Sequence, residues 1–315
     1  MPKSSSGGVG TIKSLLVTGG SGLLGSAVVR RAVGKFRVTS TYHKNPVALN
    51  GAQFVCANLL DDRDLETLSL AKPEVIIHCA ALTDVDYCES HPEEAFAQNV
   101  QASINVAEMA RDLGSYMIHV STDSVFDGEK GAYSEHDPPG PINSYGKSKL
   151  AAEQMVLKSY DHSCILRTNI FGWSATARKS MAEWMIGVLK RGEALTALKD
   201  VIISPLLTDD LSDVIFELCC LEYHGLIHIG STDSCSKLQI ARIIAETFGL
   251  DPSNIKAISV DELHLKAKRP KNTSLDIRRI SSLLGRRMPS VSDGIKRMKE
   301  LQDSGQIERT SDDRY

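Results

Sequence analysis

The first half of the 315-residue chain alternates short β-branched segments with segments of helical periodicity. SLLVTGG (14–20) is typical of a buried strand that ends in glycines, and LLGSAVVRRAVG (23–34) of a helix that Gly34 ends. Further strands are predicted at 37–43, 52–59, 74–82, 116–128 and 163–173, and helices at 62–71 and 91–114. This alternation predicts an α/β fold with a parallel, doubly wound sheet, that is, a Rossmann domain.

The regular alternation of strands and helices ends after about Gly172. Beyond it, helices are predicted at 179–192, 209–222 and 236–250, with a short strand at 226–230. We therefore expect a dinucleotide-binding Rossmann domain over 12–172, to which part of 200–235 returns. Residues 173–300 are expected to form mainly a smaller C-terminal substrate-binding lobe. The polar ends, 1–11 and 301–315, are expected to be flexible tails.

Composition narrows the classes of partner. A formal net charge of −3 gives no reason to expect nucleic acid or an anionic membrane. No apolar stretch approaches the roughly 18 residues needed to cross a bilayer, and the first residues lack the apolar core of a signal peptide. Seven cysteines without a CxxC pair indicate free thiols in a reducing compartment, so a cytoplasmic protein is expected. The nine histidines show no metal-binding spacing, and no metal is expected.

The segment TGGSGLLG (18–25) places three glycines at a strand-to-helix turn: Gly19, Gly22 and Gly25. A bound pyrophosphate needs a tight turn, close approach of the backbone, and a helix N-terminus directed at its charge. A purely structural turn is the alternative. The position of the glycine segment between a first strand and a helix, in a chain of βα units, favours a dinucleotide site.

The choice of dinucleotide depends on an absence. A site for NAD usually has Asp or Glu about 20 residues further on to bind the ribose 2′-hydroxyl. Here no carboxylate occurs before Asp61, and His43 with Lys44 stand where a 2′-phosphate would lie. A solvated basic loop is the alternative, but the pattern favours NADP(H) over NAD(H).

The segment PINSYGKSKLAAE (141–153) holds one tyrosine and two lysines. On a helix, Lys149 lies four residues after Tyr145 and shares its face, whereas Lys147 points elsewhere. An ammonium near a phenol stabilises the phenolate and lowers its pKa, so Tyr145 and Lys149 are predicted to transfer a proton. A plain helix entry with Asn143 or Ser144 as N-cap is compatible with that role.

The segment HVSTDSVFDG (119–128) supplies hydroxyls at the end of a buried strand. Ser121 or Thr122 could donate a hydrogen bond to a substrate carbonyl, although polar residues that close a strand are often only turn formers. His78 and His119 lie within apolar strands and are expected to be hydrogen-bonded core residues rather than catalysts.

Together the glycine turn, HCAALTDVDYCE (78–89), STDSVFDG, YGKSKLAAE and RTNIFG (167–172) resemble the extended short-chain dehydrogenase/reductases. Within that family they are most similar to the dTDP-4-dehydrorhamnose reductase group, from about Leu15 to Met298. The resemblance implies a catalytic set of Thr122, Tyr145 and Lys149. It implies cofactor contacts from Gly19, Ser21, Gly22, Leu23, Leu24, Asn58, Leu59, Cys79, Ala80, Ala81 and Ser121, besides His43 and Lys44. It implies substrate contacts from Thr83, Asp84, Asp86, Asp123, Ser124, Arg269 and Asn272.

Three positions depart from the group: Ser124 where Tyr is common, Asn58 where Asp is usual, and Ile170 where Trp is usual. These changes leave the exact sugar open.

By resemblance we expect an NADPH-dependent reductase of a keto group at C4 of a nucleotide-linked 4-keto-6-deoxyhexose, with hydride from nicotinamide and a proton from Tyr145. The loop lacks the Asp-Glu pair of a dehydratase, because Ser124 replaces the Glu. An epimerase would use the same three catalytic residues. A third hypothesis is a non-catalytic NADP-binding regulatory subunit, like the beta subunit of methionine adenosyltransferase. Oligomeric state stays open, with a homodimer as one option.

Overall fold

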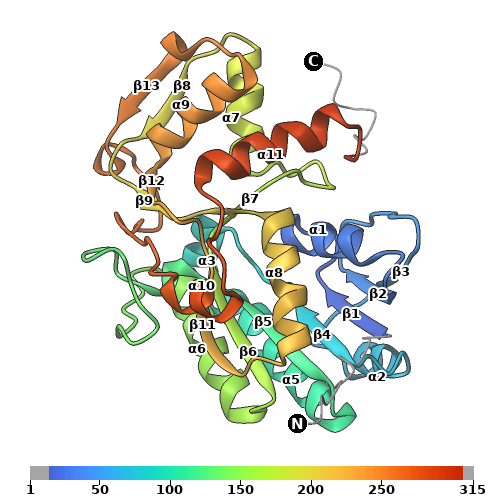
Figure 1. Ribbon diagram of the computed structural model, residues 1–315. Coiled ribbons are helices and arrows are strands. Elements are labelled where there is room, and N and C mark those ends of the chain that lie inside the picture. Colours follow the sequence, from blue (N-terminus) through green and yellow to red (C-terminus); the bar gives the residue numbers. More distant parts are fainter. Residues whose placement is uncertain (1–13, 308–315) are drawn as a thin grey trace, which may run out of the picture.

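A seven-stranded parallel sheet forms the larger of two lobes in the computed structural model, which describes residues 14–307 (Figure 1). Its strands are β1 (Ser14–Thr18), β2 (Arg37–Tyr42), β3 (Ala52–Cys56), β4 (Val75–His78), β5 (Tyr116–Thr122), β6 (Ser163–Thr168) and β11 (Gly225–His228). Their order is β11-β6-β5-β4-β1-β2-β3, and every pair is parallel. The order reverses between β1 and β4, which is the place where such sheets bind ligands. The predicted α/β fold is confirmed.

Helices cover both faces of the sheet. One face packs on α1 (Leu23–Ala32), α8 (Thr208–Leu221) and α10 (Arg278–Leu284), and the other on α2 (Asp62–Ser69), α5 (Ala102–Leu113) and α6 (Ser144–Ser159). Alternate strand residues face the two layers, so Leu15 and Val17 enter one core and Leu16 the other. Because both faces are covered, the central strands β1 and β4 are buried along their whole length.

The predicted long helix at 91–114 is interrupted. It consists of α4 (Pro92–Phe96), a π-helical turn (Ala97–Gln101) and α5, which ends at Gly114 with a φ of 67°. The π-helical turn carries the buried Asn99, whose amide oxygen accepts from the Leu82 N–H at 2.7 Å. Its amide nitrogen donates to the Leu82 carbonyl at 3.1 Å and to Ser148 Oγ at 2.9 Å. Asn99 therefore joins the loop after β4 to α6.

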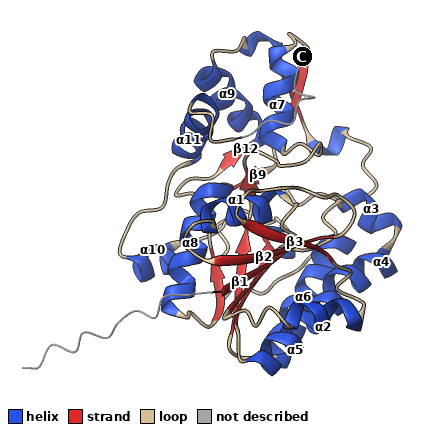
Figure 2. Cartoon of the chain, turned by 90° about the vertical axis from the view of Figure 1, so that its right-hand side faces the viewer, coloured by secondary structure: helices blue, strands red, loops and turns tan. Residues whose placement is uncertain are grey.

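The smaller lobe stands beyond one end of the sheet, with β9 and β12 between the two (Figure 2). It has a core of its own. Its elements are α7 (Met181–Lys190), β8 (Leu195–Leu198), β9 (Ile202–Ile203), β12 (Cys235–Ser236), α9 (Lys237–Phe248), a 3-10 turn (Pro252–Asn254), β13 (Ile255–Ile258), a 3-10 turn (Val260–Glu262) and α11 (Val291–Asp303). The short strands β7 (Ile170–Phe171) and β10 (Leu206–Leu207) pair with each other, and α3 (Val85–Ser90) follows β4.

The chain returns to the larger lobe twice. The first return is α8 with β11, from the 200–235 segment that the sequence had indicated. The second is α10, which packs against β11 and which the prediction had left in the smaller lobe. The last helix runs to Asp303 and buries Leu301, so residues 301–303 are not part of a tail. The predicted tail at 1–11 lies outside the described residues.

All seven cysteines are free, and Cys88, Cys164, Cys219 and Cys235 are buried. Within residues 14–307, no helix combines the length and the apolar character that crossing a membrane requires.

A buried ion pair joins α6 to β6. The Arg167 guanidinium donates to both carboxylate oxygens of Glu153, from Nε at 2.9 Å and from Nη2 at 2.6 Å. Both side chains are 4% exposed, and the guanidinium lies 5.1 Å from the centre of the Phe126 ring. Ser121 Oγ donates to the same carboxylate. The pair therefore fixes the helix that carries Tyr145 against the end of β5.

We expect Arg167→Leu to lower the free energy of unfolding by about 3–5 kcal/mol, because it leaves the Glu153 carboxylate buried without a counter-charge. Adding Glu153→Leu should recover most of the loss. Urea unfolding would measure both. Arg278→Leu is the control, since its pair with Asp276 lies at the surface and should matter little. Equal losses in the buried and the exposed variant would contradict the role given to this pair.

Candidate active site

The glycine turn is bonded to the end of β2. The Gly19 N–H donates to Thr41 Oγ1 at 3.0 Å, and the Gly20 N–H donates to the Thr41 carbonyl at 2.7 Å. Helix α1 follows with Gly22 as N-cap, no side-chain capping bond and no acidic residue in its first turn. Its first N–H groups thus lack a negative partner in the helix itself, which suits an anionic ligand.

Close packing brings the end of β4 against the same turn. Gly19 has a φ of 69°, and a Cβ atom there would lie 2.7 Å from the Ala80 Cα. The Cys79 N–H donates to the Thr18 carbonyl at 3.1 Å. The structure therefore brings residues 79–81 beside the turn, at the switch point of the sheet.

The other predicted cofactor residues follow β2 and β3. His43 and Lys44 are exposed directly after β2. Asn58 lies after β3, where its N–H donates to Asp64 Oδ2 at 2.7 Å and its side-chain oxygen accepts from the Leu60 N–H at 3.2 Å. Leu59 beside it is buried. These residues share the edge of the sheet at which the glycine turn lies.

Helix α6 presents the Tyr145 face as its spacing predicts. Asn143 is the N-cap, and its side-chain oxygen accepts from the Gly146 N–H at 2.8 Å. Lys147 is exposed and Lys149 is 2% exposed, which confirms that the two lysines point to different sides.

The Thr122 hydroxyl lies near the Tyr145 phenol and acts to lower the pKa of that phenol. Thr122 Oγ1 accepts from the Ser124 N–H at 3.1 Å and lies 3.2 Å from Asp123 Oδ1. Burial raises the pKa of the Tyr145 phenol, and the nearby Thr122 hydroxyl offsets only part of that rise. The phenol is therefore neutral at neutral pH and can act as a proton donor.

Asp123 is 1% exposed and links the end of β5 to segments far along the chain. Its Oδ2 accepts from Thr273 Oγ1 at 2.6 Å and from Asn169 Nδ2 at 2.9 Å. Burial raises the pKa of this carboxyl, although its hydrogen bonds to Thr273, Asn169 and Thr122 oppose the rise. Asp123 was expected to contact substrate, and the structure gives it partners inside the protein.

The Lys149 ammonium has other partners than the sequence predicts. Its ammonium donates to the Val120 carbonyl at 2.8 Å and lies 3.3 Å from His119 Nε2. Burial raises the pKa of Tyr145, and the Lys149 ammonium takes its partners in β5 rather than the phenol, so the expected lowering of that pKa is absent. The physical reason is that a buried ammonium takes the acceptors nearest to it, and these lie in β5 beneath the helix.

The predicted substrate residues pair partly with one another. Asp86 Oδ2 accepts from Arg269 Nη2 at 2.7 Å, and Asp86 Oδ1 accepts from the Ala267 N–H at 2.9 Å. Burial alone would raise the pKa of Asp86, but these bonds bring it below its usual value. Asp84 caps α3 by accepting from the Tyr87 N–H at 2.9 Å, beside the exposed Thr83. Asn272 accepts from Ser274 Oγ at 2.7 Å, which holds its loop.

Sequence reasoning missed Lys237, the first residue of α9. Burial lowers the pKa of its ammonium, nearby Arg269 lowers it further, and Asp123 opposes both. Lys237 therefore brings a second cation from the smaller lobe to the region of Asp123. No motif marks this residue, because its position depends on the packing of the two lobes. Asn99 was missed for the same reason.

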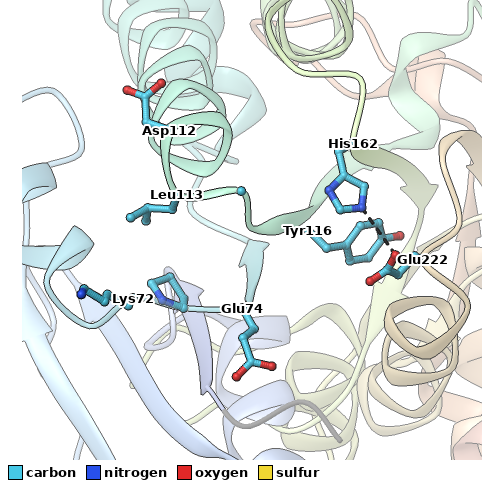
Figure 3. Close-up of a pocket in the computed structure, with 9 residues that line it drawn as sticks. Lys72, Glu74, Asp112, Leu113, Tyr116, His162 and Glu222 are labelled. Carbon is cyan, nitrogen blue, oxygen red and sulfur yellow. Dashed lines mark ion pairs between the residues drawn. The ribbon is translucent and has the colours of Figure 1, made fainter. Parts of the chain in front are cut away.

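A separate pocket lies at the opposite end of the sheet (Figure 3). It is lined by Lys72, Glu74, Asp112, Tyr116, His162, Glu222 and their neighbours, with His162 Nε2 3.7 Å from Glu222 Oε2. Tyr116 begins β5, whereas Thr122 ends it, so this pocket is remote from Tyr145. In the described part of the chain, no three His, Cys, Asp or Glu side chains gather as a metal ion would require.

Gly146 allows α6 to approach the Thr122 loop, since a Cβ there would lie 2.3 Å from the Ser124 carbonyl oxygen. Alanine normally stabilises a helix relative to glycine by about 1 kcal/mol. We expect Gly146→Ala to do the opposite and to lower the free energy of unfolding by about 1–3 kcal/mol, because the clash is with backbone. Urea unfolding would test this, with the exposed Lys147→Ala as control. A stabilised Gly146→Ala would contradict the close approach.

Comparisons with known proteins agree with this geometry. A family model described as the RmlD substrate binding domain matches residues 13–303. The probable low-salt glycan biosynthesis reductase Agl14 of Haloferax volcanii is 33% identical over 291 residues, which are 89% of this chain and 95% of that protein. Methionine adenosyltransferase 2 subunit beta of Xenopus laevis is 33% identical over 285 residues, 87% of this chain and 84% of that protein.

Among solved structures, dTDP-4-dehydrorhamnose reductase from Bacillus anthracis in complex with NADP superposes with a TM-score of 0.82 at 28% identity. The superposition covers 92% of this chain and 99% of that one. The family match spans both lobes, from the start of β1 to the end of α11. The chain therefore belongs to the RmlD substrate binding domain family, in the dTDP-4-dehydrorhamnose reductase-like group that its motifs resemble.

Proposed function

We propose that the protein is an NADPH-dependent reductase of a keto group, with C4 of a nucleotide-linked 4-keto-6-deoxyhexose as the preferred substrate position. The observation that carries the proposal is the hydroxyl pair of Tyr145 and Thr122, at the same sheet edge as the glycine turn. The similarity to a dTDP-4-dehydrorhamnose reductase in complex with NADP supports it.

In the proposed reaction the bound nicotinamide cofactor supplies hydride to the carbonyl carbon. The neutral phenol of Tyr145 then gives its proton to the developing alkoxide, and the Thr122 hydroxyl orients the substrate oxygen. The tyrosinate left behind regains a proton from solvent. Lys149 would favour this anion through the positive charge of its ammonium, since its pKa of about 8 leaves it largely charged at neutral pH.

Two regions of positive charge would hold the anionic parts of the ligands. The N-terminus of α1 suits a pyrophosphate, and Lys44 after β2 suits a ribose 2′-phosphate. On the substrate side, Arg269 and Lys237 bring cations from the smaller lobe, and the diphosphate of a nucleotide-linked sugar would relieve their mutual repulsion.

A second candidate function is that of a non-catalytic regulatory subunit. It is favoured by the 33% identity to methionine adenosyltransferase 2 subunit beta over most of both chains. Thr122, Tyr145 and Lys149 are all present, and the hydroxyl groups of the first two lie near each other, which supports turnover. The two candidates differ in a measurable way, because only the reductase oxidises NADPH in the presence of a keto sugar.

We expect Tyr145→Phe to reduce NADPH oxidation by about 10²–10⁴-fold, since it removes only the proton donor. The absorbance of NADPH should be followed across a panel of nucleotide-linked and free ketones. Cofactor binding, measured by NADPH fluorescence, should persist in the variant. Unchanged turnover would refute the role of Tyr145. Absence of turnover in the wild type, with co-purification of a larger catalytic partner, would favour the regulatory subunit.

We expect Lys44→Ala to weaken NADPH binding by roughly tenfold and to leave NADH binding unaltered, because only NADPH carries the 2′-phosphate. Dissociation constants for both cofactors would show this. Lys35→Ala is the matched control, since Lys35 is an exposed lysine at the other end of β2. An unaltered preference between the two cofactors would refute the proposed phosphate contact.

A further inference from the structure

A buried imidazole lies against the lysine of the proposed catalytic set. His119, in the middle of β5, is 0% exposed. Its Nε2 lies 3.3 Å from the Lys149 ammonium, which also donates to the carbonyl of the next residue, Val120, at 2.8 Å. His119 has no direct role in the proposed reaction.

The contact with Lys149 determines the tautomer of the His119 ring. An ammonium has only hydrogens to donate, so Nε2 must be the acceptor and the ring proton must lie on Nδ1. Burial, Lys149 and His78 all lower the pKa of His119 well below its ordinary value, which keeps the ring neutral. Within the described residues Nδ1 has no hydrogen-bond partner. The only polar contact of this ring is therefore the one with Lys149.

The neighbouring His78 is satisfied in a different way. Its Nδ1 lies 2.7 Å from Thr18 Oγ1, and its Nε2 lies 3.0 Å from Ser103 Oγ. Because the Ser103 hydroxyl donates to the Asn99 carbonyl at 2.6 Å, Ser103 Oγ accepts from His78 Nε2. Both nitrogens of His78 thus link elements of the fold. His119 packs with its ring centre 5.3 Å from that of His78, and its one hydrogen-bond contact within the described residues is with Lys149 of α6. A polar ring at this buried position is therefore explained by the lysine rather than by packing alone.

We propose that His119 is a positioning residue: its neutral Nε2, together with the Val120 carbonyl, holds two of the three ammonium hydrogens of Lys149. Within residues 14–307 the third hydrogen has no hydrogen-bond acceptor, so it stays available to a ligand or to the Tyr145 phenolate. The holding of Lys149 is a property of the protein alone, whereas its effect on turnover rests on the proposed function.

The groups around Lys149 determine its pKa, and the contact with His119 adds to their effect. Burial lowers the pKa of Lys149 to about 8, and Glu153 on its own helix opposes that shift, as does Cys79 after β4. Glu153 is in turn paired with Arg167 of β6. His78 and His119 are neutral, with the pKa of His78 lowered to about 3. An ammonium hydrogen binds an acceptor more strongly than an amine hydrogen does, so the loss of the acceptor must lower the pKa of Lys149 further.

The first test uses the protein without ligands. NMR of lysine side chains labelled with ¹⁵N, assigned through Lys149→Arg, would follow the titration of Lys149. We expect His119→Phe to lower the pKa of Lys149 by about one unit, since a hydrogen bond to a charged group is worth about 1.5–3 kcal/mol and one unit is 1.36 kcal/mol. His119→Gln should restore it, because an amide oxygen accepts at similar reach. His162→Phe, at the far end of the strands, is the control.

If the Phe variant does not fold, His119→Leu carries the same expectation. A folded apolar variant with an unshifted lysine pKa, or a Gln variant that shifts as far as the apolar one, would overturn the proposal.

The second test concerns turnover. The ammonium is lost as pH rises through its pKa, so reductase activity should fall on the alkaline side, and this limb should move to lower pH in His119→Phe. At pH 8 we expect kcat to fall about fivefold with little change in the KM of the ketone, because the charged fraction of Lys149 falls from about one half to about one tenth. A shifted lysine pKa in a protein without turnover would support the positioning role while contradicting the reductase. Normal turnover in His119→Phe with an unshifted pKa of Lys149 would support the reductase while contradicting the positioning role.

Discussion

The buried carboxylate of Asp123 is the interaction on which the rest of the site depends. It lies at the end of β5 and accepts hydrogen bonds from Asn169, which follows β6, and from Thr273, whose N–H donates to the Ile202 carbonyl of β9. It also bonds the Thr122 hydroxyl that faces Tyr145. A buried charge without partners is costly, so the fold can keep Asp123 only by bringing these segments together. One carboxylate thus fixes the catalytic loop and the attachment of the lobe beside it.

Parallel sheets buried on both faces leave little room for polar groups, which explains how the proposed chemistry is arranged. Glu153, Arg167 and Lys149 are all buried next to the ends of β5 and β6. Each has a partner from a different element: Arg167 binds Glu153, and Lys149 binds the backbone of β5. Because these polar contacts lie beneath α6, they hold the helix that carries Tyr145 without occupying the surface at which a ligand would bind.

The relatives show why residues rather than fold must decide the activity. The chain resembles both a probable glycan biosynthesis reductase and a subunit of methionine adenosyltransferase to the same 33% identity. One fold therefore serves proteins with different names and roles. The Tyr145–Thr122 pair supports the first of these roles for this chain.

The sequence by itself determined the sheet, the glycine turn and the face shared by Tyr145 and Lys149. Each of these follows from local regularities, since strand and helix periods and turn residues act over a few positions. The tertiary structure alone decided the contacts between distant segments. Asp86 meets Arg269, Asp123 meets Thr273, and Lys149 turns to His119 rather than toward the phenol of Tyr145. The π-helical interruption at Asn99 and the return of α10 to the larger lobe also depend on contacts between distant segments. The physical reason is that buried polar groups choose partners by proximity in space, and sequence spacing carries no record of that proximity.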